Sequence, residues 1–188
     1  MSWNATRLGA AAAMGVLAFL INLVTGMLIV TATGIPAGGA PLMAFICPMI
    51  LVLIALLIPF FPSATLASAV WGVLALAAPI VGPPGFLPKL IAFVAMGLAC
   101  DIPMWFLRSR EKIASIVSGL TTDFGIFAVG ITVFVLFLPP ELAGKFIEIV
   151  HIVLIACVVL GPIGGLTGWK MFDVIRNRAI VVRLRGGE

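Results

Sequence analysis

Six apolar runs, separated by short segments rich in glycine and proline, dominate the sequence. Each run is long enough for the roughly 20-residue α-helix that crosses a hydrocarbon core about 30 Å thick. They occupy residues 8–33, 40–60, 63–81, 86–107, 113–138 and 146–169. A segment inside a bilayer has no water to bond with, so it must satisfy its own backbone, as an α-helix does. The sequence therefore predicts an all-α integral membrane protein built as a bundle of six transmembrane helices.

The composition supports the same fold class and limits what else the chain can hold. Of its 188 residues, 63% are hydrophobic and only 10% are charged, which excludes an ordinary water-soluble domain and a disordered segment. Six helices of about 20 residues each leave too little chain for a separate catalytic domain. We therefore expect one transmembrane domain over residues 1–188, ending in a short basic tail at about 170–188.

Lysine and arginine are unevenly divided between the two sides of such a bundle. With six spans, only Lys89 and Lys145 fall on the side opposite the chain ends, and the others share the side of both termini. Basic segments next to a membrane helix stay in the cytoplasm. The bias predicts that both termini are cytoplasmic and that the protein lies in the cell membrane. Since the charges cluster at helix ends, the anionic partner is the lipid bilayer and not a nucleic acid.

Residue patterns that carry catalysis are nearly absent. The chain has one histidine and no tyrosine, and it lacks HExxH, GxSxG and the phosphate-binding GxxxxGK[ST]. Its three cysteines, Cys47, Cys100 and Cys157, lie inside apolar runs without metal-ligand spacing. We therefore expect a protein that is not an enzyme and that binds neither a cofactor nor a metal.

Two polar residues lie deep inside the apolar runs. A polar side chain in this position is expensive unless it is paired or faces a cavity, so each is a candidate site. Asp123, near the bilayer midplane in the fifth run, is either the floor of a ligand pocket or an acid that bonds a neighbouring helix. Asn22, in the middle of the first run, is either a ligand contact or an interhelical hydrogen-bonding group.

A second group of polar residues gathers on the outer side. Glu148 and His151 are three residues apart and so share a helix face, and Lys89 begins the fourth run on the same side. These three residues form either a solvated rim or the polar part of a ligand cavity in the outer half of the bundle. We expect that cavity beneath the loops at 35–40 and 139–145, with Asp123 and Asn22 completing its ligand-binding residues.

The first run contains small residues spaced four apart, Gly9 with Ala13 and Ala11 with Gly15. Such spacing lets another helix approach closely, either within the same bundle or from a membrane partner. We expect this strip to be a coupling interface.

The chain resembles a substrate-binding S component of an energy-coupling factor (ECF) vitamin transporter. The likeness rests on the six-helix plan and the small-residue strip, with Gly9-xxx-Ala13 and Ala11-xxx-Gly15 in place of that family's AxxxA coupling motif. It also rests on Gly82-Pro-Pro-Gly-Phe-Leu-Pro-Lys89 and on Gly161-Pro-Ile-Gly-Gly-Leu-Thr-Gly-Trp-Lys170, which leads into the basic tail.

The resemblance implies how such a protein works. It would capture a vitamin-like small molecule from outside, dock on a transmembrane coupling protein driven by two cytoplasmic ATPases, and topple to release the ligand inside. The family's metal-binding members have a histidine-bearing N-terminus, which this sequence lacks, so a metal substrate is not expected.

Two other classes of function remain open from the residues. One is a small membrane enzyme or redox protein that acts on a lipid or quinone through His151, Asp123 or Cys157. The other is a structural subunit of a larger membrane complex. A transport subunit would retain a small molecule or gain uptake activity with ATPase partners, whereas a structural subunit would do neither.

Overall fold

The computed structural model describes residues 4–33, 40–78, 84–137 and 140–185. These residues form helices and no strands. The helices are α1 (Ala5–Thr33), α2 (Ala40–Leu57), α3 (Ser63–Leu76), α4 (Pro88–Phe106), α5 (Glu111–Phe137), α6 (Pro140–Ile175) and α7 (Ala179–Arg185), with a 3-10 turn at Arg108–Arg110 before α5.

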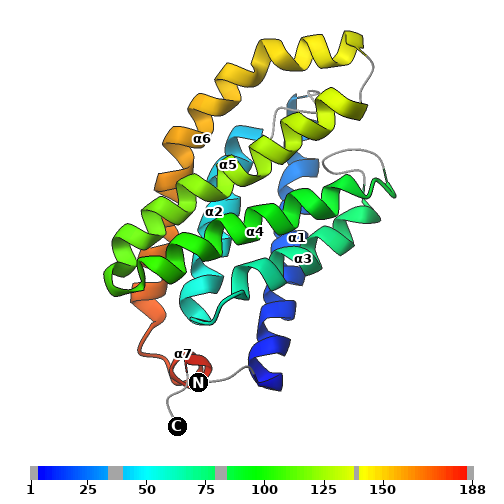
Figure 1. Cartoon of the computed structure of the whole chain (residues 1–188). Helices are drawn as coiled ribbons and strands as arrows, with labels where there is room; N and C mark the ends of the chain where they lie inside the picture. The colour runs from blue at the N-terminus through cyan, green and yellow to red at the C-terminus, as the bar shows by residue number, and fades with distance from the viewer. Residues whose placement is uncertain (1–3, 34–39, 79–83, 138–139, 186–188) are drawn as a thin grey trace.

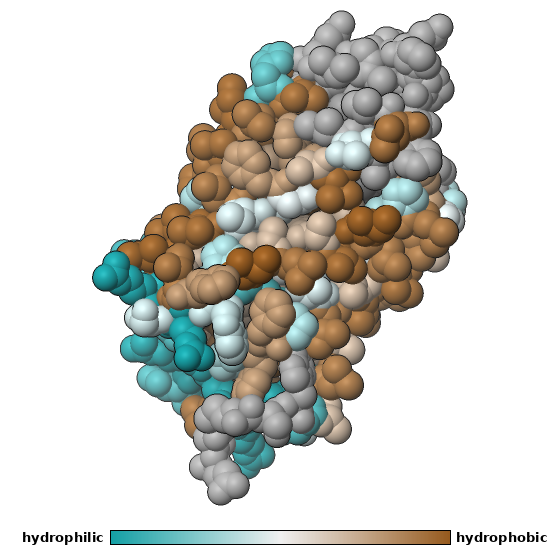
Figure 2. Space-filling model, viewed as in Figure 1, coloured by the Kyte–Doolittle hydropathy of each residue, from teal (hydrophilic) through white to brown (hydrophobic). Residues whose placement is uncertain are grey.

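Helices α1 to α6 run alternately up and down, and α7 lies across one end of the bundle beside the N-terminus (Figure 1). We call this the termini end, and the opposite end the far end. Four helical segments in the described part of the chain are long and apolar enough to cross a membrane, and α2 and α3 are shorter apolar helices. Figure 2 shows an apolar surface along the helices and hydrophilic side chains gathered toward the termini end. The chain is an all-α, multi-pass membrane protein, as predicted.

The largest difference from the predicted boundaries is in α6. Its 36 residues begin at Pro140 instead of 146 and end at Ile175 instead of 169. A helix of this length measures about 54 Å, well beyond the thickness of the hydrocarbon core. The sequence pattern identified only the apolar part, because polar residues such as Glu141 and Lys145 interrupt the hydropathy without interrupting the helix.

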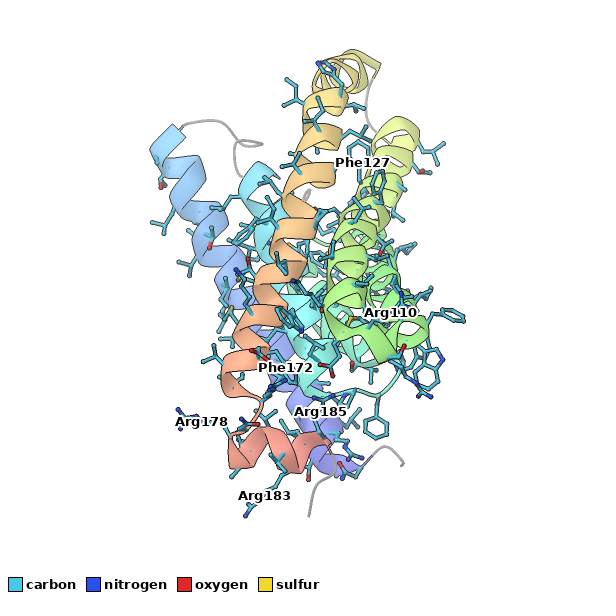
Figure 3. The ribbon with its side chains drawn as sticks, turned by 90° about the vertical axis from the view of Figure 1, so that its left-hand side faces the viewer. Arg110, Phe127, Phe172, Arg178, Arg183 and Arg185 are labelled. Atoms are coloured by element: carbon cyan, nitrogen blue, oxygen red, sulfur yellow. The ribbon has the colours of Figure 1, made fainter. Side chains whose placement is uncertain are left out.

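The C-terminal segment also differs from a simple tail. After α6, the chain turns and α7 packs back onto the termini end, where Val181 is buried. Nε of Arg7 donates to the carbonyl oxygen of Leu184 at 2.9 Å, and Arg185 forms an ion pair with Glu111 at 2.9 Å. Figure 3 shows Arg178, Arg183 and Arg185 around this helix. Helix α7 therefore links the first turns of α1 and α5.

Glycines set the close contacts of α6 with its two main neighbours. A Cβ atom on Gly119 of α5 would collide with the carbonyl oxygen of Gly161, and one on Gly165 would collide with that of Ser115. Gly168 makes a similar approach to the backbone of α2 at Met49. Small residues allow membrane helices to pack backbone against backbone, which explains how α2, α5 and α6 form a tight block.

Candidate ligand-binding site

Lys89 is almost fully buried, with 1% of its surface exposed, at the start of α4. Its Nζ donates to the carbonyl oxygens of Ala78 at 2.8 Å and Ala75 at 3.2 Å. Carbonyl groups at the end of a helix have no partner within the helix and attract cations. The Lys89 side chain therefore caps the C-terminal end of α3, a role that was not predicted from the sequence.

The Lys89→Ala variant is expected to lose about 2 to 4 kcal/mol of stability, because two buried carbonyl oxygens lose their donor and a buried side chain leaves a cavity. Thermal unfolding in detergent measures this loss. Lys89→Met keeps most of the buried volume but removes the donor. Its loss of stability therefore separates the hydrogen-bond contribution from the cavity contribution. A Lys89→Ala protein as stable as the wild type would contradict the capping role.

The Asp101 side chain caps the other end of α3, its N-terminal end. Its carboxylate accepts hydrogen bonds from the backbone N–H of Ala64 at 3.1 Å, and from the backbone N–H and the hydroxyl of Thr65, both at 2.7 Å. Negative groups are stabilising at a helix N-terminus. The charge at 101 thus supports the fold, and α4 satisfies both ends of α3.

Asp123 lies in the middle of α5 with only 2% of its surface exposed. Among the described residues, no hydrogen-bond partner reaches its Oδ2 atom. A Cβ atom on Gly161 would lie 2.8 Å from this oxygen, so the missing side chain of Gly161 provides the space for the carboxyl. Cys47 of α2 and Cys157 of α6 lie close enough to interact with it electrostatically. Asp123 is therefore a buried acid whose partner is not among the described side chains.

Asn22 is also buried, with 5% exposure, and its amide joins α1 to α2. Nδ2 donates to the sulfur of Met43 at 2.9 Å. Of the two roles left open for this amide, the interhelical bond is present. Cys47 of α2 lies near both Asn22 and Asp123.

The rim residues are not brought together in the same way. His151 is exposed on α6, whereas Lys89 is buried against α3, and no contact joins them in the described part of the chain. The side chain of Glu148 lies outside the described residues, as do residues 35–39 and 139 of the two loops predicted above the cavity. Residues 140–145, predicted as part of the second loop, belong instead to α6.

The small-residue strip of α1 is divided between two faces. Gly9 and Ala13 are exposed, and a Cβ atom on Gly9 would meet nothing within 4 Å. Ala11 is fully buried, and a Cβ atom on Gly15 would collide with the carbonyl oxygen of Ala67 in α3. Ala11 and Gly15 thus pack within the bundle, and Gly9 and Ala13 remain open to another molecule.

A cavity of about 260 Å³ lies at the termini end, between the end of α4, the start of α5 and α7. Asp101, Arg108, Glu111 and Arg185 are among its lining residues. Asp101 is bound to α3, Arg185 is paired with Glu111, and the Arg108 guanidinium lies 5.2 Å from the centre of the Trp105 ring. The polar groups of this cavity therefore have partners, unlike Oδ2 of Asp123. No cluster of metal-ligating side chains occurs among the described residues.

No protein-family model and no curated protein matches the sequence. The fold does match a solved structure, described as the crystal structure of an S-component of ECF transporter, with a TM-score of 0.65. The match covers 97% of this chain and 90% of that chain at 15% sequence identity. The chain has the S-component fold.

The S-component fold confirms the resemblance seen in the sequence at the level of architecture, an all-α membrane bundle. The cytoplasmic orientation of the termini, the ligand-binding residues and the coupling face remain predictions.

Proposed function

We propose that the protein is the substrate-binding subunit, the S component, of an ECF-type importer, and that it does not itself catalyse a reaction. The observation that carries this proposal is the S-component fold, matched over 97% of the chain. The exposed Gly9 and Ala13 on α1 support it, because they leave a place where a partner helix can approach the bundle closely.

In this proposal, the termini end faces the cytoplasm of a prokaryotic cell. The excess of lysine and arginine at that end supports this orientation. The partners are a transmembrane coupling protein, which docks at Gly9 and Ala13, and two cytoplasmic ATPase subunits. ATP hydrolysis by those subunits drives the release of the ligand, since this chain carries no phosphate-binding motif of its own.

The substrate is a vitamin-like small molecule, captured from outside in the half of the bundle toward the far end. Asp123 and Asn22 form the floor of that site, and Glu148 and His151 supply polar groups nearer the surface. Lys89 contributes by fixing the end of α3 beside the site, because its ammonium group is already held by two carbonyl oxygens.

Two measurements on one preparation test this function. Native mass spectrometry of the detergent-purified protein should detect a retained small molecule. Proteoliposomes that contain this chain, a coupling protein and both ATPases should then accumulate the same molecule in the presence of ATP. Proteoliposomes with hydrolysis-deficient ATPases are the control. A protein that retains no small molecule and supports no ATP-dependent uptake would remove the assignment.

A further inference from the structure

One helical face of α5 is tightly packed against α6 near Gly119, whereas toward the far end the described residues leave Gly130 without a close neighbour. Gly119, Asp123, Phe127 and Gly130 lie on this face, since they are separated by three, four or seven residues. At Gly119, the backbones of α5 and α6 touch, whereas a Cβ atom on Gly130 would meet no described atom within 4 Å. Asp123 therefore lies where the close contact of α5 and α6 ends, on the side toward the far end.

The carboxyl at this position is poorly satisfied. Its Oδ2 atom is buried without a hydrogen-bond partner among the described residues, and the nearby thiols of Cys47 and Cys157 are weak donors. An acid in a membrane interior is costly unless a cation or a strong donor accompanies it. Asp101 is the internal comparison, because its two oxygens accept three hydrogen bonds from α3. The protein therefore satisfies the buried acid at position 101, whereas no described group bonds Oδ2 of Asp123.

The groups around Asp123 favour a positively charged ligand over a neutral one as the partner of its carboxyl. Phe127, labelled in Figure 3, is half-buried one turn from Asp123 toward the far end. The face of an aromatic ring attracts cations, so an acid and a ring on one helix face form a suitable environment for a positively charged nitrogen. Lys89 offers no free ammonium group for an anionic ligand, because α3 occupies it.

We propose that Asp123 selects the substrate, which carries a positively charged nitrogen that binds the Asp123 carboxylate beside Phe127. This inference rests on the proposed function, and it names the chemical class of molecule that the site takes. A ligand whose only charge is a carboxylate or phosphate is excluded from this floor, because it would place two negative groups together in a medium of low dielectric constant.

Three probes of one shape and different charge test the selection. Benzamidinium, benzamide and benzoate are added at equal millimolar concentration to the detergent-purified full chain, and the melting temperature is measured. Benzamidinium should raise the melting temperature of the wild type more than the other two. In Asp123→Asn, its affinity should fall roughly 10- to 100-fold, as expected when one partner of a charged hydrogen bond is removed.

The control variant is Thr122→Val. Thr122 is fully buried next to Asp123, and its hydroxyl donates to the Ser118 carbonyl of its own helix at 2.6 Å. This variant should keep the preference for benzamidinium. The inference is overturned if the wild type does not prefer benzamidinium, or if Asp123→Asn keeps that preference. ATP-dependent uptake separates the two proposals: if uptake occurs without the preference, only the substrate class is wrong, and if uptake is absent, the function itself is wrong.

Discussion

The Ala13→Leu variant is expected to bind ligand like the wild type but to lose at least about tenfold of its ATP-dependent uptake. Ala13 is exposed on α1, one turn from Gly9, so a leucine here leaves the packing of the bundle unchanged. It does cover the small-residue face against which a coupling helix would pack, and such faces depend on close backbone approach. Proteoliposome uptake and ligand binding to the isolated chain measure the two quantities separately.

The control for this experiment comes from the same helix. Gly15→Leu should instead lower thermal stability, because its side chain would collide with Ala67 and Val70 of α3. The comparison therefore separates a docking face from a packing face only two residues away. Wild-type uptake by Ala13→Leu would exclude the Gly9 and Ala13 face from coupling.

The Gly119→Leu variant is expected to lose about 3 kcal/mol or more of stability, and we expect little folded protein from it. Its Cβ atom would overlap the Gly161 carbonyl, so α5 and α6 would have to separate along their main contact. Gly130→Leu, on the same helix, should change the melting temperature little because a Cβ atom there would meet no described atom within 4 Å. Size-exclusion elution and thermal unfolding in detergent measure both variants. Equal stability of the two would mean that the backbone contact at Gly119 does not hold the bundle together.

Much of the fold could be predicted from the sequence because hydropathy and helix breakers act locally. Apolar runs between Gly/Pro segments located helices α1 to α6, and Pro48 and Pro103 inside two runs did not mislead the assignment. The ends of α6 could not be found in this way. A helix that leaves the bilayer continues through polar residues, and its end depends on contacts made by the segment that follows.

The roles of the charged residues were harder to predict, because they depend on which helix lies opposite. Lys89 and Asp101 stand near the two ends of α4, and the preceding apolar run, 63–81, is the shortest of the six predicted runs. Together, these features indicate a helix whose ends are satisfied by its neighbour, and this signal was available in the sequence. The neighbour itself was not, since helix pairing is a property of the whole bundle.

The coupling strip illustrates a different difficulty. Residues four apart share a helix face, but two such pairs offset by two residues lie about 200° apart around the axis. Gly9 and Ala13 therefore point away from Ala11 and Gly15, as the exposure of the first pair and the burial of the second show. Spacing alone identified close-packing residues, and only the position of α3 distinguishes the two faces.

The double capping of α3 by Asp101 and Lys89 has a consequence for how the protein can sit in a bilayer. At 14 residues, α3 is about 21 Å long, shorter than a hydrocarbon core of roughly 30 Å. A helix this short creates hydrophobic mismatch, which a membrane relieves by thinning around it. Here, backbone groups at both ends of α3 that have no partner within the helix are bonded to side chains of α4 instead of to lipid headgroups or water. The backbone groups bonded in this way need neither water nor lipid headgroups, so the ends of α3 can lie below the membrane surface.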